Sequence, residues 1–347
     1  MRTSPRMTHL AAIGVAALAL TALAGCSIDT GQGGGSSSSE SGSKADGMGD
    51  DGVFTVAAFT AGYGTPAGKL AMDDFVEKAK EKGWKVTLYT SAFDYDKLNS
   101  DVSAAIAQGA DAVMAGFPDP RQIAPIVQAA NDADIPIFSI DGGVEANPDF
   151  VLDITFGQQA MADGTIEALS EAMGGLEGKN VMVIGHDPHV GIHARSNLAV
   201  DELEAAGATI AGGEMKLVLD PGTSRTESLD FVTDYLQANP DGLDGVWAGW
   251  DDAALGAVQA IEEAGRDDVF VTGVDALAQT VDKIREGSPM YATASQDWIS
   301  VVDQELEALD SYATSAELPA ENFVEEEPFI VTPDNADDFE PTLGLTD

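Results

Sequence analysis

The sequence predicts an α/β protein made of two doubly wound, parallel-sheet lobes joined by a hinge. Short apolar runs, typical of buried strands, alternate with amphipathic helical segments from about residue 53 onward. Two such β-α-β series follow each other, one before about residue 155 and one after it. In sheets of this kind ligands bind outside the carboxyl ends of the strands, so the residues directly after each strand are the first candidates for a site.

Proline and glycine residues lie at the ends of several expected helices and help to define the expected helices and strands. The expected strands are 54–60, 85–89, 112–115, 135–140, 150–154, 180–184, 209–211, 245–248, 269–272 and 290–293. Helices are expected to begin near Pro66, Asp94, Arg121, Gln158, Gly191, Thr223, Asp252 and Ala278. Pro66 and Pro125 suit a first helical turn, where the missing N–H of proline is not needed. Glycines in "AIAQGADAV", "EAAGATI" and "EEAGRDDV" are typical helix stops.

The first residues have the pattern of a signal peptide, expected over residues 1–25. Arg2 and Arg6 supply positive charge, and the apolar run at 10–24 is shorter than the ~20 residues that a spanning helix needs. The run continues into "LAGC", which resembles the bacterial lipoprotein box, so Cys26 is expected to be lipidated. The alternative is an ordinary signal peptide that ends near a cysteine. Cys26 is the only cysteine, so no internal disulfide is possible.

Residues 26–52 are rich in glycine and serine and are expected to form a flexible tether. The folded part is then divided between the two lobes. We expect the N-terminal lobe at 53–154 plus about 297–325, and the C-terminal lobe at 155–296 plus about 326–347.

The chain is strongly acidic, with 59 Asp and Glu against 17 Lys and Arg and a formal net charge of −42. Nucleic acids and anionic lipid surfaces bind basic residues, so neither is an expected partner. The acids are spread along the chain, which is typical of a solvated surface and is consistent with adaptation to salt.

Polar side chains follow the expected strands in both halves of the chain. In order, they are Tyr63, Thr65, Asp141, Arg195, Asp251, Asp275 and Gln296, with Trp250 and Trp298 nearby. Carboxylates accept hydrogen bonds from hydroxyls, while guanidinium and amide groups donate them. An aromatic face covers the C–H side of a sugar ring. This mixture therefore favours a neutral, polyhydroxylated ligand.

The region from about residue 53 to 310 resembles the ribose-type periplasmic sugar-binding proteins of ABC importers. The resemblance rests on "EKAKEKGWKV", "AIAQGADAVMAGFPDP", "AANDADIPIFSIDGG", "YLQANPDGLDGVWAGWDDAALGAVQAIEEAGRDDVFVTGVDA" and "YATASQDW", which occur in family order. It implies the type I periplasmic-binding-protein fold and ligand roles for Asp141, Arg195, Asp275 and Gln296. The chain departs from the family at 65–68, where "TPAG" replaces two aromatic residues, and at Trp250, where the family has an amide. Ribose is therefore not the expected ligand, whereas another pentose, a hexose or a sugar alcohol is.

The resemblance implies a lipid-anchored solute-binding protein on the extracytoplasmic face of the cell membrane. It would be a monomer that captures a carbohydrate by hinge closure and delivers it to ABC permease subunits. No enzymatic activity, cofactor, metal or nucleic acid is expected. The alternative is a sensor that presents its ligand to a membrane receptor, and no residue distinguishes the two roles.

Three other motifs in the sequence could indicate binding or catalytic chemistry. Gly62-x-Gly64-x-x-Ala67 fits a dinucleotide fingerprint, but the second strand does not end in the acid that the ribose requires. His186, His189 and His193 could form a three-histidine zinc site or line the ligand site. Asp251 and Asp252 are paired acids, as in glycosidases, but their place at a strand end and a helix start favours a structural role.

Overall fold

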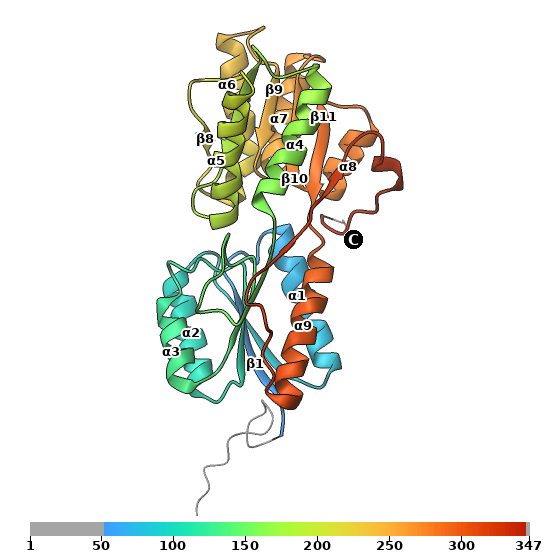
Figure 1. The fold of residues 1–347 in the computed structure, drawn as a ribbon. Helices are drawn as coiled ribbons and strands as arrows, with labels where there is room; N and C mark the ends of the chain where they lie inside the picture. The colour runs from blue at the N-terminus through green and yellow to red at the C-terminus, as the bar shows by residue number, and fades with distance from the viewer. Residues whose placement is uncertain (1–51, 345–347) are drawn as a thin grey trace, which may run out of the picture. The chain divides into compact units, whose positions relative to one another are not determined.

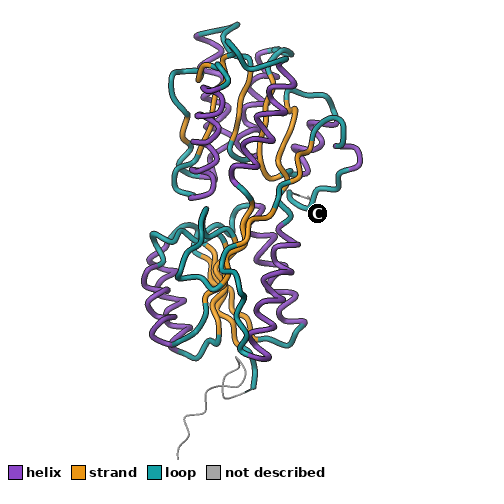
Figure 2. Tube along the Cα trace, viewed as in Figure 1, coloured by secondary structure: helices purple, strands orange, loops and turns teal. Residues whose placement is uncertain are grey.

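The computed structural model describes residues 52–344, which form two α/β lobes (Figures 1 and 2). The expected signal peptide, Cys26 and nearly all of the expected tether lie outside the described residues. Within 52–344, no helix combines the length and the apolar character needed to cross a bilayer.

The first lobe is built on a sheet of parallel strands in the order β12-β5-β4-β3-β1-β2. Its strands are β1 (Thr55–Thr60), β2 (Lys85–Thr90), β3 (Ala112–Gly116), β4 (Ile137–Ile140), β5 (Leu152–Phe156) and β12 (Val324–Glu326). Its helices are α1 (Pro66–Glu81), α2 (Tyr95–Ala107), α3 (Ala124–Ala133) and α9 (Trp298–Ser315). Helices α1 and α9 lie on one side of the lobe, and α2 and α3 lie on the other (Figure 1).

The second lobe has the strand order β13-β11-β10-β9-β6-β7, with β8 also paired to β6. The strands are β6 (Asn180–Gly185), β7 (Thr209–Ile210), β8 (Lys216–Leu217), β9 (Gly245–Ala248), β10 (Phe270–Asp275), β11 (Met290–Ser295) and β13 (Phe329–Val331). The helices are α4 (Gln158–Met173), α5 (Val190–Ala205), α6 (Ser224–Ala238), α7 (Asp251–Ala264) and α8 (Ala278–Arg285), with 3-10 turns at Pro221–Thr223 and Ala336–Asp338. Only β13 is antiparallel to its neighbour among the described strands.

Each sheet is covered by helices on both faces, and its strands contribute side chains to two separate hydrophobic cores. In β1, Val56 and Ala58 pack in the core under α1 and α9, whereas Ala57 and Phe59 pack in the core under α2 and α3. This is the two-residue period of a strand buried on both sides. The second sheet is covered in the same way by α4 and α5 on one face and by α6, α7 and α8 on the other.

The chain passes between the lobes at residues 156–158, 295–298 and 326–329. These segments leave β5 and β12 in the first sheet and β11 and β13 in the second. The opposite edges of the two sheets, at β2 and at β7, are therefore the edges farthest from the crossings. The predicted fold class, two doubly wound parallel-sheet lobes, is confirmed.

The elements differ from prediction mainly in the C-terminal part of the chain. Helix α9 and the strands β8, β12 and β13 were not expected. The helix expected near Arg121 begins at Ala124, because Asp119 accepts from the backbone N–H of Arg121 at 3.0 Å and holds the preceding residues in a turn. Pro125 lies in the first turn of that helix, as expected.

Candidate functional site

Arg195 lies at the centre of the candidate site. It is on α5, and its side chain is only 3% exposed. Its Nε donates to the carbonyl oxygen of Gly249 at 2.8 Å, and its Nη1 donates to Oε1 of Gln158 at 2.9 Å. No residue in 52–344 hydrogen-bonds its Nη2. One edge of the guanidinium is thus fixed by the protein, and the other has no protein partner.

Gln158 belongs to the candidate site because it accepts a hydrogen bond from Arg195. From the sequence it was predicted only as the start of a helix. It is the first residue of α4 and is separated from β5 by Gly157, and its Nε2 donates to the carbonyl of Phe156 at 2.9 Å. A Cβ on Gly191 would lie 3.0 Å from that Nε2, so the glycine lets the start of α5 approach the amide. The signal was the position of Gln158 close to the end of a strand.

Three carboxyl groups lie near enough to Arg195 for their charges to act on its guanidinium. Burial lowers the pKa of Arg195, and the charges of Asp275, Asp141 and Asp251 act in the opposite direction. Such a group stays charged in proteins, so the site holds a fixed cation among acids from both lobes.

Asp251 and Asp275 form a linked pair with different roles. Asp251 is fully buried, and its carboxyl group accepts from the backbone N–H of Leu277 at 2.9 Å and from Oγ1 of Thr293 at 2.8 Å. Asp275 ends β10 at a φ of 127°, and its Oδ2 accepts from the backbone N–H of Asp251 at 3.4 Å. Burial raises the pKa of both, to about 7 for Asp275. Asp251 therefore holds the turn that presents Asp275.

Asp141 comes from the other lobe, where it directly follows β4. Its Oδ1 accepts from Oγ1 of Thr155 at 2.6 Å, and its Oδ2 lies 3.4 Å from Nε2 of His189. Nδ1 of His189 accepts from the backbone N–H of Ile192, which places the proton of the neutral ring on Nε2, facing Asp141. Burial lowers the pKa of His189. This contact joins the strand ends of the two lobes.

A second contact between the lobes lies beside it. Arg121 pairs with Asp119, with 2.8 Å between Nε and Oδ1, and its Nη2 donates to the carbonyl oxygen of Pro188 at 3.1 Å. The loop at 186–189 thus reaches the strand ends of the first lobe through two neighbouring residues.

Gln296 and Trp250 complete the set at the strand ends of the second lobe. Gln296 follows β11, is 3% exposed, and its Nε2 has no partner within 52–344. Trp250 is 8% exposed, packs in the core under α7 and meets the ring of His186 edge to face at 5.8 Å. Nδ1 of His186 donates to the carbonyl of Val218 at 2.8 Å, which leaves Nε2 as an acceptor.

Tyr63 and Thr65 are engaged by contacts inside the first lobe. The hydroxyl of Tyr63 donates to Oδ1 of Asp73 at 2.6 Å, and Nζ of Lys69 lies 5.3 Å from the ring centre. The hydroxyl of Thr65 caps α1 by accepting from the backbone N–H of Gly68 at 3.1 Å, and it donates to the carbonyl of Gly62. Within 52–344, no hydrogen bond or ion pair joins either side chain to Arg195, Asp141 or Asp275.

The backbone is strained where these strands end. Among the described residues other than glycine, positive φ occurs at two helix ends, Asp134 and Ala316, and otherwise at carboxyl ends of strands. Those strand-end positions are Ala92, Phe93, Phe117, Asp141, Asp275 and Ala276. Strained residues of this kind cluster at functional sites. The strained positions thus include Asp141 in the first lobe and Asp275 in the second, both of which are candidate site residues.

The three histidines do not converge. His186 and His189 have the partners described above, and Nδ1 of His193 lies 3.0 Å from Oδ1 of Asp187. Within 52–344, no three His, Cys, Asp or Glu side chains are grouped so that they could hold a metal ion.

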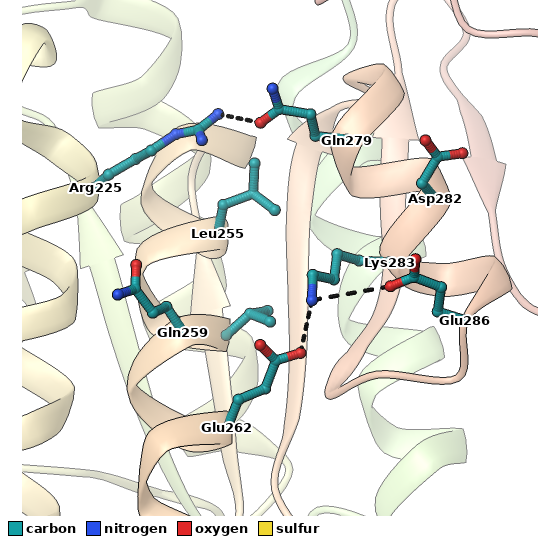
Figure 3. Close-up of a pocket in the computed structure, with 9 residues that line it drawn as sticks. Arg225, Leu255, Gln259, Glu262, Gln279, Asp282, Lys283 and Glu286 are labelled. Carbon is teal, nitrogen blue, oxygen red and sulfur yellow. Dashed lines mark hydrogen bonds and ion pairs between the residues drawn. The ribbon is translucent and has the colours of Figure 1, made fainter.

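A surface pocket of about 400 Å³ lies elsewhere, between α7 and α8 (Figure 3). Leu255 and Val258 form its apolar part, and charged side chains surround it. Lys283 pairs with Glu262 at 2.8 Å, and Arg225 bonds Asp252 and Gln279, so these cations already have partners. The pocket lies along the helices and not at the strand ends.

Two α/β lobes with charged and amide side chains gathered at their facing strand ends define a solute-binding protein. The sequence from 55 to 317 matches the model of the periplasmic binding protein domain family, and the chain belongs to that family. Its members are binding proteins, not enzymes.

Characterised relatives are import binding proteins. The chain is 29% identical over 246 residues to a D-apiose import binding protein of Actinobacillus succinogenes, covering 70% of this chain and 76% of the relative. It is 27% identical over 248 residues to a ribose import binding protein of Bacillus subtilis, covering 70% and 76%. A solved solute-binding protein of Mycobacterium smegmatis with bound glycerol is 25% identical, with a TM-score of 0.69 over 85% of this chain and 100% of that one.

The fold recurs in more distant solved structures. A solute-binding protein of Agrobacterium vitis with bound allitol has a TM-score of 0.72, at 23% identity over 82% of this chain and 97% of that one. A protein of Bacillus halodurans with bound myo-inositol has a TM-score of 0.73, at 20% identity over 84% and 98%. These structures confirm the fold class.

Proposed function

We propose that this protein is an extracytoplasmic lipoprotein that captures a sugar or sugar alcohol between its lobes and delivers it to an ABC importer. The observation that carries the proposal is the half-satisfied guanidinium of Arg195, buried among Asp141 and Asp275. Nη2 of Arg195 has no protein partner and can donate to a ligand that supplies an acceptor, and Nε2 of Gln296 is a buried donor for which the lack of a partner is costly.

The polar atoms without protein partners favour an uncharged polyol. Nη2 of Arg195 and Nε2 of Gln296 are donors, while Oδ1 of Asp275 and Nε2 of His186 are acceptors. A hydroxyl group both donates and accepts, so one kind of ligand group serves all four. Arg195 is matched by acids inside the site, and a neutral ligand preserves that balance. The relatives named for D-apiose and ribose support the same ligand class.

The proposal is tested by calorimetry on the whole folded part of the protein. A panel of D-apiose, D-ribose, xylitol, allitol and myo-inositol identifies a binder, since a ligand at ~100 times its Kd adds ~2.7 kcal/mol of stability. Arg195→Ala is expected to weaken that binding by roughly 5- to 150-fold, or ~1–3 kcal/mol. Arg225→Ala, an arginine of the same lobe that pairs on the surface with Asp252, is the control and is expected to bind as wild type. Equal affinity in both variants would remove Arg195 from the site.

Anchoring and transport are separate parts of the proposal. Lipidation at Cys26 predicts that Cys26→Ser moves the protein from the membrane fraction to the soluble fraction. Delivery to an importer predicts that deleting the gene abolishes uptake of the ligand. Uptake that continues unchanged while a ligand-dependent response is lost would instead favour the sensor role.

A further inference from the structure

The turn after β2 holds an aromatic ring on an unfavourable backbone. The backbone N–H of Asp94 donates to the carbonyl of Ser91 at 3.1 Å, which closes a four-residue turn. Its two central residues, Ala92 and Phe93, have φ values of 48° and 67°. Turns with positive φ at both central positions favour Asn-Gly, because side chains with a Cβ are strained there. Ala-Phe is therefore a poor choice for the turn itself.

The ring of Phe93 is held in place and left uncovered. The backbone N–H of Phe93 donates to the carbonyl of Ala61 at 3.1 Å, which ties the turn to the end of β1. A Cβ on Gly62 would lie 3.9 Å from Cζ of Phe93, so the ring lies beside that glycine. The side chain is 47% exposed, and no aromatic residue within 52–344 packs against it. Strained residues cluster at ligand sites, and the exposed ring of this strained residue is available to a ligand at these strand ends.

The other aromatic side chains at these strand ends are occupied. Tyr63 is bonded to Asp73 and lies under Lys69. Phe117, after β3, packs edge to face on Trp298 at 4.8 Å. Phe93 is thus the aromatic ring at the carboxyl ends of β1, β2 and β3 that keeps a free face. In the same turn, Oγ of Ser91 is buried without a partner within the described residues.

We propose that Phe93 contacts the ligand and covers the C–H face of a cyclic sugar or cyclitol, so that ring ligands are preferred over open-chain polyols. The inference rests on the proposed function and assigns the ligand's shape. A ring presents a continuous apolar face that packs on an aromatic ring, whereas an open chain does not hold one. The function of the ring explains why the turn keeps Phe where glycine would relieve strain.

The test compares two glycine substitutions in one turn, Phe93→Gly and Ala92→Gly. Both relieve positive-φ strain, so both are expected to raise the melting temperature. Only Phe93→Gly removes the ring. It is expected to weaken binding of the tighter cyclic probe, D-ribose or myo-inositol, by roughly 3- to 10-fold, with less than about a 2-fold change for xylitol. Phe93→Tyr keeps the ring and is expected to bind as wild type.

The outcomes separate this inference from the proposed function. If the wild type binds a cyclic probe and Phe93→Gly and Ala92→Gly bind that probe with equal affinity, the inference is overturned. The proposed function would still stand. Binding to open-chain polyols alone would also overturn the inference. A wild-type protein that binds no sugar or polyol would contradict both. A lower melting temperature for Phe93→Gly would show that the ring serves the fold instead.

Discussion

The contacts of Arg195 fix one edge of its guanidinium and leave the other edge available to the proposed ligand. The bonds from Nε and Nη1 to Gly249 and Gln158 fix the orientation of the guanidinium. Its unpartnered Nη2 is then presented among Asp141 and Asp275 without freedom to turn away. A preorganised donor of this kind loses little rotamer entropy when a ligand binds, which favours affinity.

Asp275 makes the proposed binding dependent on pH. Burial raises its pKa to about 7, and Arg195 acts in the opposite direction. A hydroxyl that donates to this group favours the ionised form, so the affinity is expected to rise as the pH increases through 7. In Asp275→Asn this dependence is expected to disappear. Titrations from pH 5.5 to 8.5 measure it, with Asp252→Asn as the control, and affinity that falls with rising pH would contradict this role.

The sequence predicted the polar residues of the candidate site, but not which of them are bonded within the protein and which are available to a ligand. Asp141, Asp275 and Gln296 were predicted because they follow strands, and the structure places these three at strand ends, whereas Arg195 lies on α5, the helix after β6. Asp251 was found by the same rule, yet its carboxyl group is bonded to Leu277 and Thr293. Whether a strand-end side chain turns inward or outward depends on tertiary contacts that no spacing records.

At the scale of elements, close helix packing depends on Gly256 of α7. A Cβ at this position would overlap the carbonyl oxygen of Arg225 in α6, and backbone cannot yield as a side chain can. Gly256→Ala is expected to lower stability by roughly 1–3 kcal/mol despite the better helix propensity of alanine. At about 2–4 °C per kcal/mol, thermal melting resolves this.

A second helix glycine provides the matched control. At Gly164 in α4 the added methyl group would meet only the side chain of Ile330, with its Cδ1 at 2.6 Å, and that side chain can move. Gly164→Ala is therefore expected to change stability less than Gly256→Ala. The opposite order would contradict the close approach of α6 and α7.

Two buried acids, Glu305 on α9 and Asp153 on β5, lie near enough for their charges to interact. Both carboxyl oxygens of Glu305 and Oδ2 of Asp153 lack partners within 52–344, while Oδ1 of Asp153 accepts from Gly142 at 2.9 Å. Burial raises the pKa of Glu305 well above its usual range and that of Asp153 to about 7. Between about pH 4 and 7 the folded state therefore binds more protons than the unfolded state. The resulting stability is present at low pH and is lost as the pH rises through 7.

Removing the ionisable group tests this account. The melting temperature of the wild type is expected to fall between pH 5.5 and 8.5, and that of Glu305→Gln is expected to fall less, because the amide cannot ionise. Glu307→Gln, an exposed acid on the same helix, is the control and is expected to follow the wild type. Parallel curves for all three proteins would place the pH dependence elsewhere.

The elements that the sequence missed have identifiable reasons. Strand β8 has two residues, and β12 and β13 have three each, so none shows a period of its own. They form because β6, β5 and β11 offer open strand edges. Helix α9 did carry a signal, with Val302, Leu306, Leu309 and Ala313 at helical spacing, but it follows β11 after only two residues.

At the scale of the molecule, the topology gives two separate lobes joined by three short segments. Each lobe has its own doubly covered sheet, and the chain joins them only at 156–158, 295–298 and 326–329 within the described residues. Rotation about a few such segments is the usual basis of hinge closure. The contacts of His189 with Asp141 and of Arg121 with Pro188 would then be made and broken as the lobes move.

Small-angle X-ray scattering of the protein with and without its sugar tests the central claim most directly. If two lobes close over a ligand gripped by Arg195, saturating sugar reduces the radius of gyration of the wild type, and the same concentration has a smaller effect on Arg195→Ala. A wild-type profile that is identical with and without a sugar shown to bind would contradict closure.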